Sequence, residues 1–134
     1  MKEEKHFQPT ESELEILQVL WEKQPCSVRL IHEQISAKRA AEKRDAIGYT
    51  TILKQVQRML LDKGMVEREK DGKSHLYTAV PKEIEIQQTL SSQLLKTAYK
   101  GSALKLAMHA LGQSKTSKEE LEELRKWLDQ QKEK

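Results

Sequence analysis

Residues 50–79 read TTILKQVQRMLLDKGMVEREKDGKSHLYTA, and this stretch decides the fold. Its first half carries apolar side chains at helical spacing, which predicts a helix from about Thr50 to Lys63. Gly64 follows directly and can adopt the left-handed backbone that commonly ends a helix. The face predicted to turn inward consists of Ile52, Val56, Met59 and Leu60. The opposite face is polar and basic, and it presents Thr51, Lys54, Gln55 and Arg58.

The second half of this stretch predicts a β-hairpin. Two runs with strand character, 66–70 and 73–79, flank Asp71-Gly72, a dipeptide that supplies the positive φ of a two-residue turn. In the register set by that turn, Lys70 lies opposite Lys73. Like charges paired across a hairpin are unfavourable unless an anion lies against them. The tip is therefore interpreted either as an anion contact or as a charged end that keeps the hairpin soluble.

Two more helices are predicted upstream. Thr10-Glu11-Ser12-Glu13 has the form of a capping box, and the apolar stripe that follows it is Leu14, Leu17 and Trp21. Ser27 can cap a second helix, whose apolar stripe is Val28, Ile31 and Ile35. The order helix, helix, helix, hairpin predicts a winged helix-turn-helix domain over residues 1–81.

Residues 82–134 are predicted to be helical throughout. Ile86, Leu90 and Leu94 recur every four residues, residues 102–111 are apolar on nearly every side, and Ser117 opens a second capping box. A helix that is apolar all round needs cover on every side, and this short tail has little else to supply it. We expect a dimerisation domain formed by Ile86, Leu90, Leu94, Leu104, Leu106, Met108, Leu111, Leu121, Leu124 and Leu128. The alternative is that these helices fold back on the first domain.

The charge distribution favours a nucleic-acid partner. The net charge of the 134 residues is only +3, but residues 36–82 carry 11 basic and 6 acidic side chains. Lys and Arg can donate to guanine or phosphate, Gln can pair with adenine, and a Thr methyl can contact thymine, so the outer face of the third helix suits the major groove. Thr50 and Thr51 near the helix start, and Lys70 and Lys73 on the hairpin, could bind phosphates. A plain solvated face is the competing interpretation.

Several other classes of protein are disfavoured. One cysteine, Cys26, cannot form an internal disulfide, and the four histidines lack the spacing of a zinc site. His32-Glu33 lacks the second histidine of a zinc-protease motif, and no glycine-rich phosphate loop occurs among 5 glycines. No catalytic residue, metal, cofactor or small-molecule ligand is therefore predicted. Without an apolar run of bilayer length or a signal peptide, a cytoplasmic location is expected.

Four stretches together carry a resemblance to a known family. They are PTESELEILQVLWEK, GYTTILKQVQRMLLDKGMVEREKDGKSHLYTAV, LLKTAYKGSALKLAMHAL and SKEELEELRKWL. The chain resembles the penicillinase and methicillin-resistance repressor family of bacterial winged-helix transcription regulators. The resemblance implies a mainly α fold, with a winged helix-turn-helix domain followed by a C-terminal helical dimerisation domain. It also implies a homodimer that represses transcription from a dyad-symmetric operator, and release of DNA when a membrane metalloprotease sensor triggers repressor cleavage.

Three departures from the family pattern affect what can be carried over. The family joins its second and third helices briefly, whereas here residues 36–48 intervene with Lys38, Arg39, Lys43 and Arg44. We interpret this segment as an extended second helix with a basic end, where Arg44 either contacts DNA phosphate or is simply solvated. The family's Asn-Phe cleavage dipeptide matches His109-Ala110, and the Cys-x-Cys pairs of metal-responsive relatives are absent, which disfavours copper sensing.

The sequence therefore predicts a homodimeric, DNA-binding transcriptional repressor that is not an enzyme. Its predicted partners are double-stranded operator DNA, a second copy of itself and a membrane-bound metalloprotease sensor. A winged-helix module that binds protein instead of DNA is the alternative.

Overall fold

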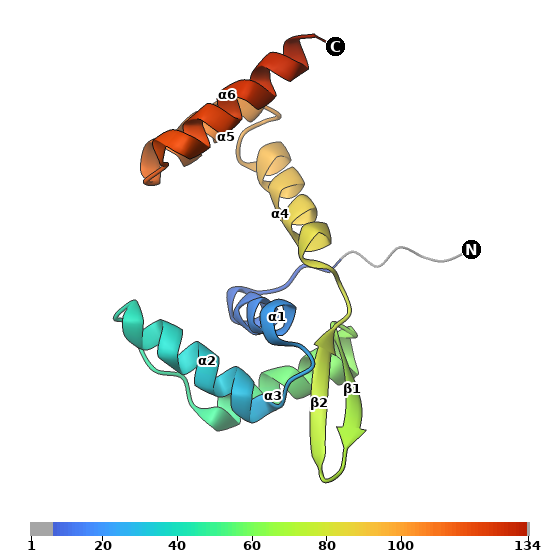
Figure 1. The fold of residues 1–134 in the computed structure, drawn as a ribbon. Coiled ribbons are helices and arrows are strands. Elements are labelled where there is room, and N and C mark those ends of the chain that lie inside the picture. The colour runs from blue at the N-terminus through green and yellow to red at the C-terminus, as the bar shows by residue number, and fades with distance from the viewer. Residues whose placement is uncertain (1–6, 134) are drawn as a thin grey trace, which may run out of the picture. The chain divides into compact units, whose positions relative to one another are not determined.

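The computed structural model describes residues 7–133, and residues 1–6 and 134 of the two predicted domains lie outside this range. The chain forms two compact units that divide after Leu90. The first contains α1 (Glu11–Lys23), α2 (Val28–Ala41), α3 (Tyr49–Arg58) with its π-helical turn η1 (Met59–Lys63), β1 (Val66–Asp71) and β2 (Ser74–Ala79) (Figure 1). Helix α4 (Glu83–Thr97) crosses the division, and α5 (Ala103–Gln113) and α6 (Lys118–Lys132) follow. The predicted mainly α fold with one hairpin is confirmed, whereas the predicted functional boundary after residue 81 stays a prediction.

Side-chain caps fix where the helices begin. Thr10 Oγ1 accepts a hydrogen bond from the Glu13 amide at 3.2 Å, and Glu13 Oε1 accepts one from the Thr10 amide at 2.9 Å. Ser27 Oγ accepts from the Leu30 amide at the start of α2. Ser117 and Glu120 form the same reciprocal box at the start of α6. Each cap satisfies amides that have no partner inside the helix, so the two predicted capping boxes are confirmed.

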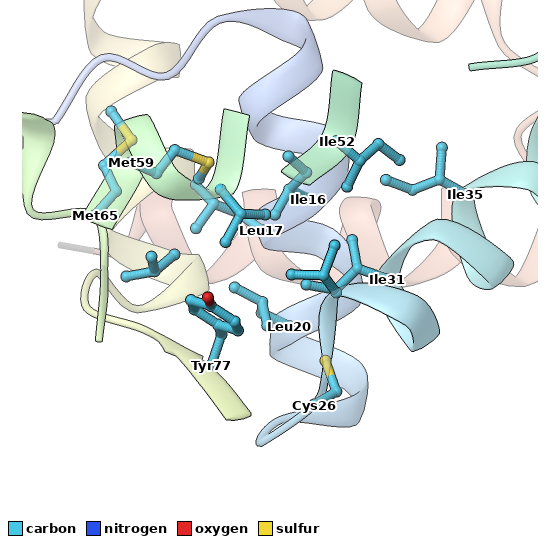
Figure 2. Packing of buried hydrophobic residues seen from close by; sticks show 13 residues of the cluster. Ile16, Leu17, Leu20, Cys26, Ile31, Ile35, Ile52, Met59, Met65 and Tyr77 are labelled. Atoms are coloured by element: carbon cyan, nitrogen blue, oxygen red, sulfur yellow. The ribbon is translucent and has the colours of Figure 1, made fainter. Parts of the chain in front are cut away.

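The core lies among the three helices and the hairpin. Figure 2 shows Leu17 and Leu20 of α1 among side chains from α2, α3 and the hairpin, with Tyr77 of β2 beside Leu20. The fully buried members of this cluster include Ile16, Leu17, Leu20, Ile31, Ile52, Val56 and Met59. On α1 the inward face is Ile16, Leu17 and Leu20, so the predicted stripe is rotated. Leu14 and Trp21 are half-buried at its margins, where the Trp21 indole donates to the Pro81 carbonyl at 3.0 Å.

The hairpin pairs in a different register from the predicted one. Asp71 pairs with Ser74, which makes Gly72 and Lys73 the two turn residues, and Lys70 lies opposite His75. Gly72 has φ +63, the positive value that the first residue of a II′-type turn requires. The predicted opposition of Lys70 and Lys73 is therefore wrong. Because the register differs by two residues, each strand residue keeps its predicted face, and Val66 and Tyr77 still point into the core.

A short bridge attaches the hairpin to the helices. Cys26, between α1 and α2, exchanges two backbone hydrogen bonds with Tyr77 of β2, at 3.1 and 2.9 Å. The Gln24 side-chain oxygen accepts another bond, from the Ala79 amide at 2.8 Å. Strand β2 therefore has β1 on one edge and the α1–α2 connection on the other, which fixes the base of the hairpin.

Helix α3 ends where the sequence predicts, but its last turn is wider. Residues 59–63 form a π-helical turn, and Gly64 closes it in the left-handed conformation with φ 64. Met59 stays fully buried and Leu60 packs partly against the core. Leu61, in contrast, is 77% exposed, because at nine residues after Ile52 it lies on the opposite face of the helix.

Glu13 joins the start of α1 to the end of this turn. Glu13 is only 4% exposed. Its Oε2 accepts a hydrogen bond from Lys63 Nζ at 2.7 Å, and its Oε1 accepts one from the Thr10 amide in the cap of α1. Burial raises the pKa of Glu13, but the hydrogen bonds from Lys63 and Thr10 and the Lys63 charge outweigh it, so the pKa lies below its ordinary value. A carboxyl whose pKa is lowered by folding stabilises the folded state above its unfolded pKa.

We predict that Glu13→Gln lowers the free energy of unfolding at pH 7 by about 1–3 kcal/mol, because it removes a charged, buried hydrogen-bond acceptor. The deficit should shrink as pH falls through the pKa of the folded protein, where wild-type Glu13 becomes protonated too. Urea denaturation at several pH values measures this. Glu11→Gln, at an exposed position in the same turn, is the matched control and should cost less than about 0.5 kcal/mol. A Glu13→Gln deficit that is the same at pH 3 and pH 7 would contradict the assignment.

Candidate nucleic-acid interface

Helix α3 is held rigidly by its inner face and leaves its outer face open. Ile52 and Val56 are fully buried against the core, so the helix cannot turn about its axis. Its N-cap, Gly48, provides no side-chain hydrogen bond to the first turn. Thr50, Thr51, Lys54, Gln57 and Arg58 are exposed on the outer side. Four of the five predicted contact positions on this helix are thus available to a ligand.

Gln55 is placed differently from the prediction. It is half-buried, and its side-chain oxygen is buried without a hydrogen-bond partner among the described residues. Gln57 is exposed three residues after Lys54, and the sequence analysis missed it. The signal was present in the helical period, since positions directly opposite Ile52 and Val56 include Lys54 and Gln57.

The basic side chains of the first unit differ in whether carboxylates neutralise them. Among residues 7–133, ion pairs are found for Arg39, Arg44 and Lys63. Lys54 and Arg58 on α3, and Lys70 and Lys73 on the hairpin, have none in this range. All four are exposed. Their positive charge is therefore available to an anionic partner.

Glu15 of α1 pairs with two of the four basic side chains of residues 36–48, namely Arg39 in the last turn of α2 and Arg44 beyond its end. Glu15 Oε1 lies 2.6 Å from Arg39 Nη2 and 3.2 Å from Arg44 Nη2, and Glu42 takes the other Arg44 nitrogen at 3.0 Å. Arg39 also donates to the Asp45 carbonyl at 3.1 Å. The hydrogen bond from Arg39 lowers the pKa of Glu15, and the charges of Arg39 and Arg44 lower it further. Burial raises this pKa, but the net result lies below the ordinary value. Helix α2 continues to Ala41, so the predicted extension is confirmed only as far as that residue, and residues 42–48 form a non-helical connection. The DNA contact of Arg44, which lies in this connection, stays a prediction.

The hairpin presents its charges at an exposed tip. Lys70, Lys73 and His75 are all exposed, while Val66 and Tyr77 at the base are buried. The base is held by the Cys26 bridge described above. The tip therefore extends cations from a fixed base, an arrangement suited to contacts with a sugar-phosphate backbone.

The predicted dimerisation residues fall into two groups. Ile86 is 2% exposed within the single chain and needs no second copy to cover it. Helices α5 and α6 contain no buried residue at all. The predicted positions that are largely exposed are Leu94, Leu104, Met108, Leu111, Leu121 and Leu128, while Leu90, Leu106 and Leu124 are half-buried. Trp127 is 53% exposed on α6 and was missed by the sequence analysis.

The predicted cleavage dipeptide lies within α5. His109 and Ala110 are both exposed. The His109 Nδ1 lies 3.1 Å from the Tyr99 hydroxyl, and the two rings meet edge to face with centroids 5.5 Å apart. The bond itself is helical, so a protease would need local opening to cut it.

Other kinds of site are poorly supported in the part of the chain that the structure describes. No group of three potential metal ligands is found there. Cys26 is buried, and burial raises the pKa of its thiol, which is the opposite of what a reactive thiolate requires. None of the helices in residues 7–133 is both long and apolar enough to span a bilayer.

Three packed helices that carry a hairpin tethered beside the first interhelical connection define a winged-helix domain. The profile of the penicillinase repressor family matches residues 9–130, and the chain belongs to this family of transcriptional repressors. Methicillin resistance regulatory protein MecI of Mammaliicoccus sciuri is 28% identical over 125 residues, which cover 93% of this chain and 96% of that protein. The proteins of the same name from Staphylococcus aureus strain N315 and Staphylococcus epidermidis are each 27% identical over the same shares. The relatives are regulatory proteins, so the expected family is confirmed.

Proposed function

We propose that the chain is a cytoplasmic, homodimeric repressor that binds a dyad-symmetric DNA operator through α3 and the hairpin. The observation that carries this proposal is the outer face of α3, where Lys54 and Arg58 are exposed and unpaired within the described residues. A helix about 10–12 Å across fits the major groove of B-DNA. Arg58 can donate two hydrogen bonds to guanine, and Gln57 can pair with adenine or donate to phosphate.

The hairpin would act beside the groove that α3 occupies. Lys70 and Lys73 at its tip would bind backbone phosphates, which position a protein on DNA but carry no sequence information. Family membership and the similarity to methicillin resistance regulatory proteins support this assignment. Five exposed cations on these two elements have no ion pair within the described residues, and they favour an anionic partner: Lys54, Arg58, Arg68, Lys70 and Lys73.

We predict that Arg58→Ala weakens binding to a selected operator duplex by about 1–3 kcal/mol and relaxes discrimination against scrambled DNA. Lys73→Ala should weaken both duplexes about equally, because its contact is with phosphate. Fluorescence anisotropy of labelled duplexes at several salt concentrations measures both effects. Arg58→Lys is the matched control, since it keeps the charge and the salt dependence but loses the planar two-bond donor. No binding of the wild-type chain to any selected duplex would favour the protein-binding alternative.

The dimer is supported by the uncovered side chains of α5 and α6. Leu104 and Met108 are 70% and 64% exposed on α5, and Trp127 is 53% exposed on α6. Two helices with no fully buried residue in one chain gain little stability from that chain alone, because helical stability in proteins comes mainly from packing an apolar face. A second copy offers the same apolar surfaces, as a two-fold interface requires.

We predict that Leu104→Glu converts the dimer to a monomer, because it places a carboxylate in the apolar contact. Leu104 is exposed in the single chain, so the substitution should leave the first unit folded. Sedimentation velocity measures the change in mass, and circular dichroism checks the fold. Lys105→Glu, at the next and also exposed position, should remain dimeric. A Leu104→Glu protein with the wild-type sedimentation coefficient would place the interface elsewhere.

Release from DNA would follow separation of the two halves of the dimer. A tethered pair of half-sites binds far more tightly than one, so cleavage within α5 would lower operator affinity steeply. We propose His109-Ala110 as the bond cut when a membrane metalloprotease sensor signals. Because His109 contacts the Tyr99 hydroxyl, opening of this part of α5 would have to break that contact first.

We predict that intact-mass analysis of the repressor from induced cells finds fragments that end at His109 and begin at Ala110. Tyr99→Phe removes the hydroxyl contact without changing the ring, so it should speed cleavage by loosening α5. Full-length protein in fully induced cells would rule out proteolytic release. Fragments that end at another residue would move the cleavage site and leave the dimer model intact.

A further inference from the structure

An open hollow lies beside the start of α3, lined by Arg29 and Tyr49. Arg29 belongs to the first turn of α2 and Tyr49 is the first residue of α3. Figure 1 shows that the beginnings of these two helices lie close together on the first unit, whereas the basic end of α2 extends away from the hairpin. Neither residue was among the predicted contacts, and Tyr49 directly precedes Thr50 and Thr51, which were.

Arg29 is an exposed cation without a carboxylate partner. Among residues 7–133 no Asp or Glu lies within ion-pair distance of Arg29, including Glu33 one turn further along α2. Arg39 and Arg44, at the other end of α2, are both held by Glu15. An anion that binds Arg44 would have to displace Glu15 and Glu42 or share the guanidinium with them. An anion that binds Arg29 would displace no carboxylate of the described residues.

The Tyr49 ring packs against the ring of His32. The ring of Tyr49 meets the ring of His32 edge to face, with centroids 5.8 Å apart and planes at 87°. His32 Nε2 is in turn hydrogen-bonded to the Ile47 carbonyl at 3.0 Å. Tyr49 is nevertheless 45% exposed. Its ring is therefore oriented before any ligand arrives, and ordering it costs little on binding.

We propose that Arg29 and Tyr49 bind a backbone phosphate of duplex DNA beside the groove occupied by α3, and that this contact, not Arg44, anchors the α2 side of the interface. A guanidinium donates to two phosphate oxygens at once, and a phenol O–H can donate to one. The hairpin tip would hold the strand on the other side of α3. This inference rests on the proposed DNA binding and adds a specific phosphate clamp to it.

The test compares salt dependence and a neutralised phosphate. With a duplex selected by the chain itself, Arg29→Ala should weaken binding about tenfold, to scrambled DNA as well, and should reduce the slope of log K against log salt by about 0.9. Arg29→Lys should keep the slope and lose part of the affinity. Arg44→Ala, the matched control, should change affinity less than about twofold and leave the slope unchanged.

Methylphosphonate substitution removes the charge of one chosen phosphate and identifies the contact. At one backbone position, this substitution should weaken the wild-type complex clearly more than the Arg29→Ala complex, which keeps only the Tyr49 contact. Tyr49→Phe should reduce the effect at the same position. Both residues are exposed, so thermal unfolding should match the wild type and exclude misfolding.

Two outcomes would overturn the clamp, and they can be told apart. If the wild type binds DNA while Arg29→Ala keeps full affinity and slope, the clamp is wrong and the proposed function stands. A slope lost in Arg44→Ala instead would assign the phosphate to the basic end of α2. If the wild type binds no duplex at any salt concentration, the clamp and the proposed function both fail.

Discussion

The Glu13 carboxylate is the interaction on which the geometry of the first unit depends. One oxygen caps α1 and the other holds Lys63, so the first turn of α1 and the last turn of the α3 segment are fixed to a single side chain. The Glu13–Lys63 contact and the buried side chains of Ile52 and Val56 together determine which face of α3 is exposed. A charge buried at a helix start is costly without partners, and of its two partners Thr10 belongs to the cap of α1 while Lys63 ends the α3 segment.

Neutralisation of charge separates the structural cations from those available for binding. Glu15 pairs with Arg39 in the last turn of α2 and with Arg44 in the connection that precedes α3, and so links both to α1. The cations on α3 and the hairpin tip have no such partner among the described residues. A paired arginine must lose or share its carboxylate before it can bind phosphate. The excess positive charge of residues 36–82 is therefore not equally available to DNA at every position.

Local patterns predicted the elements, and long-range contacts decided the details. Thr10, Ser27, Ser117 and Gly64 mark helix ends through contacts within one turn, so the sequence alone was sufficient for them. The hairpin register was missed because Asp71-Gly72 and Gly72-Lys73 both satisfy turn chemistry, and only packing of the strands selects between them. The pairing of Glu15 with Arg39 spans 24 positions, and no periodicity reports it. Gln55 is half-buried because, three residues after Ile52, it lies at the margin of the buried face of α3.

Because α5 and α6 contain no fully buried residue, the stability of the protein should depend on its concentration in the cell. Apolar side chains such as Leu104 and Met108 are exposed in the single chain, and in the proposed dimer a second copy would cover them. The uncovered chain is then the form that chaperones and housekeeping proteases recognise, and its share rises as the protein is diluted. When synthesis falls, the amount of repressor would therefore fall more steeply than the rate of synthesis. A modest drop in expression would by itself make the loss of repression steeper.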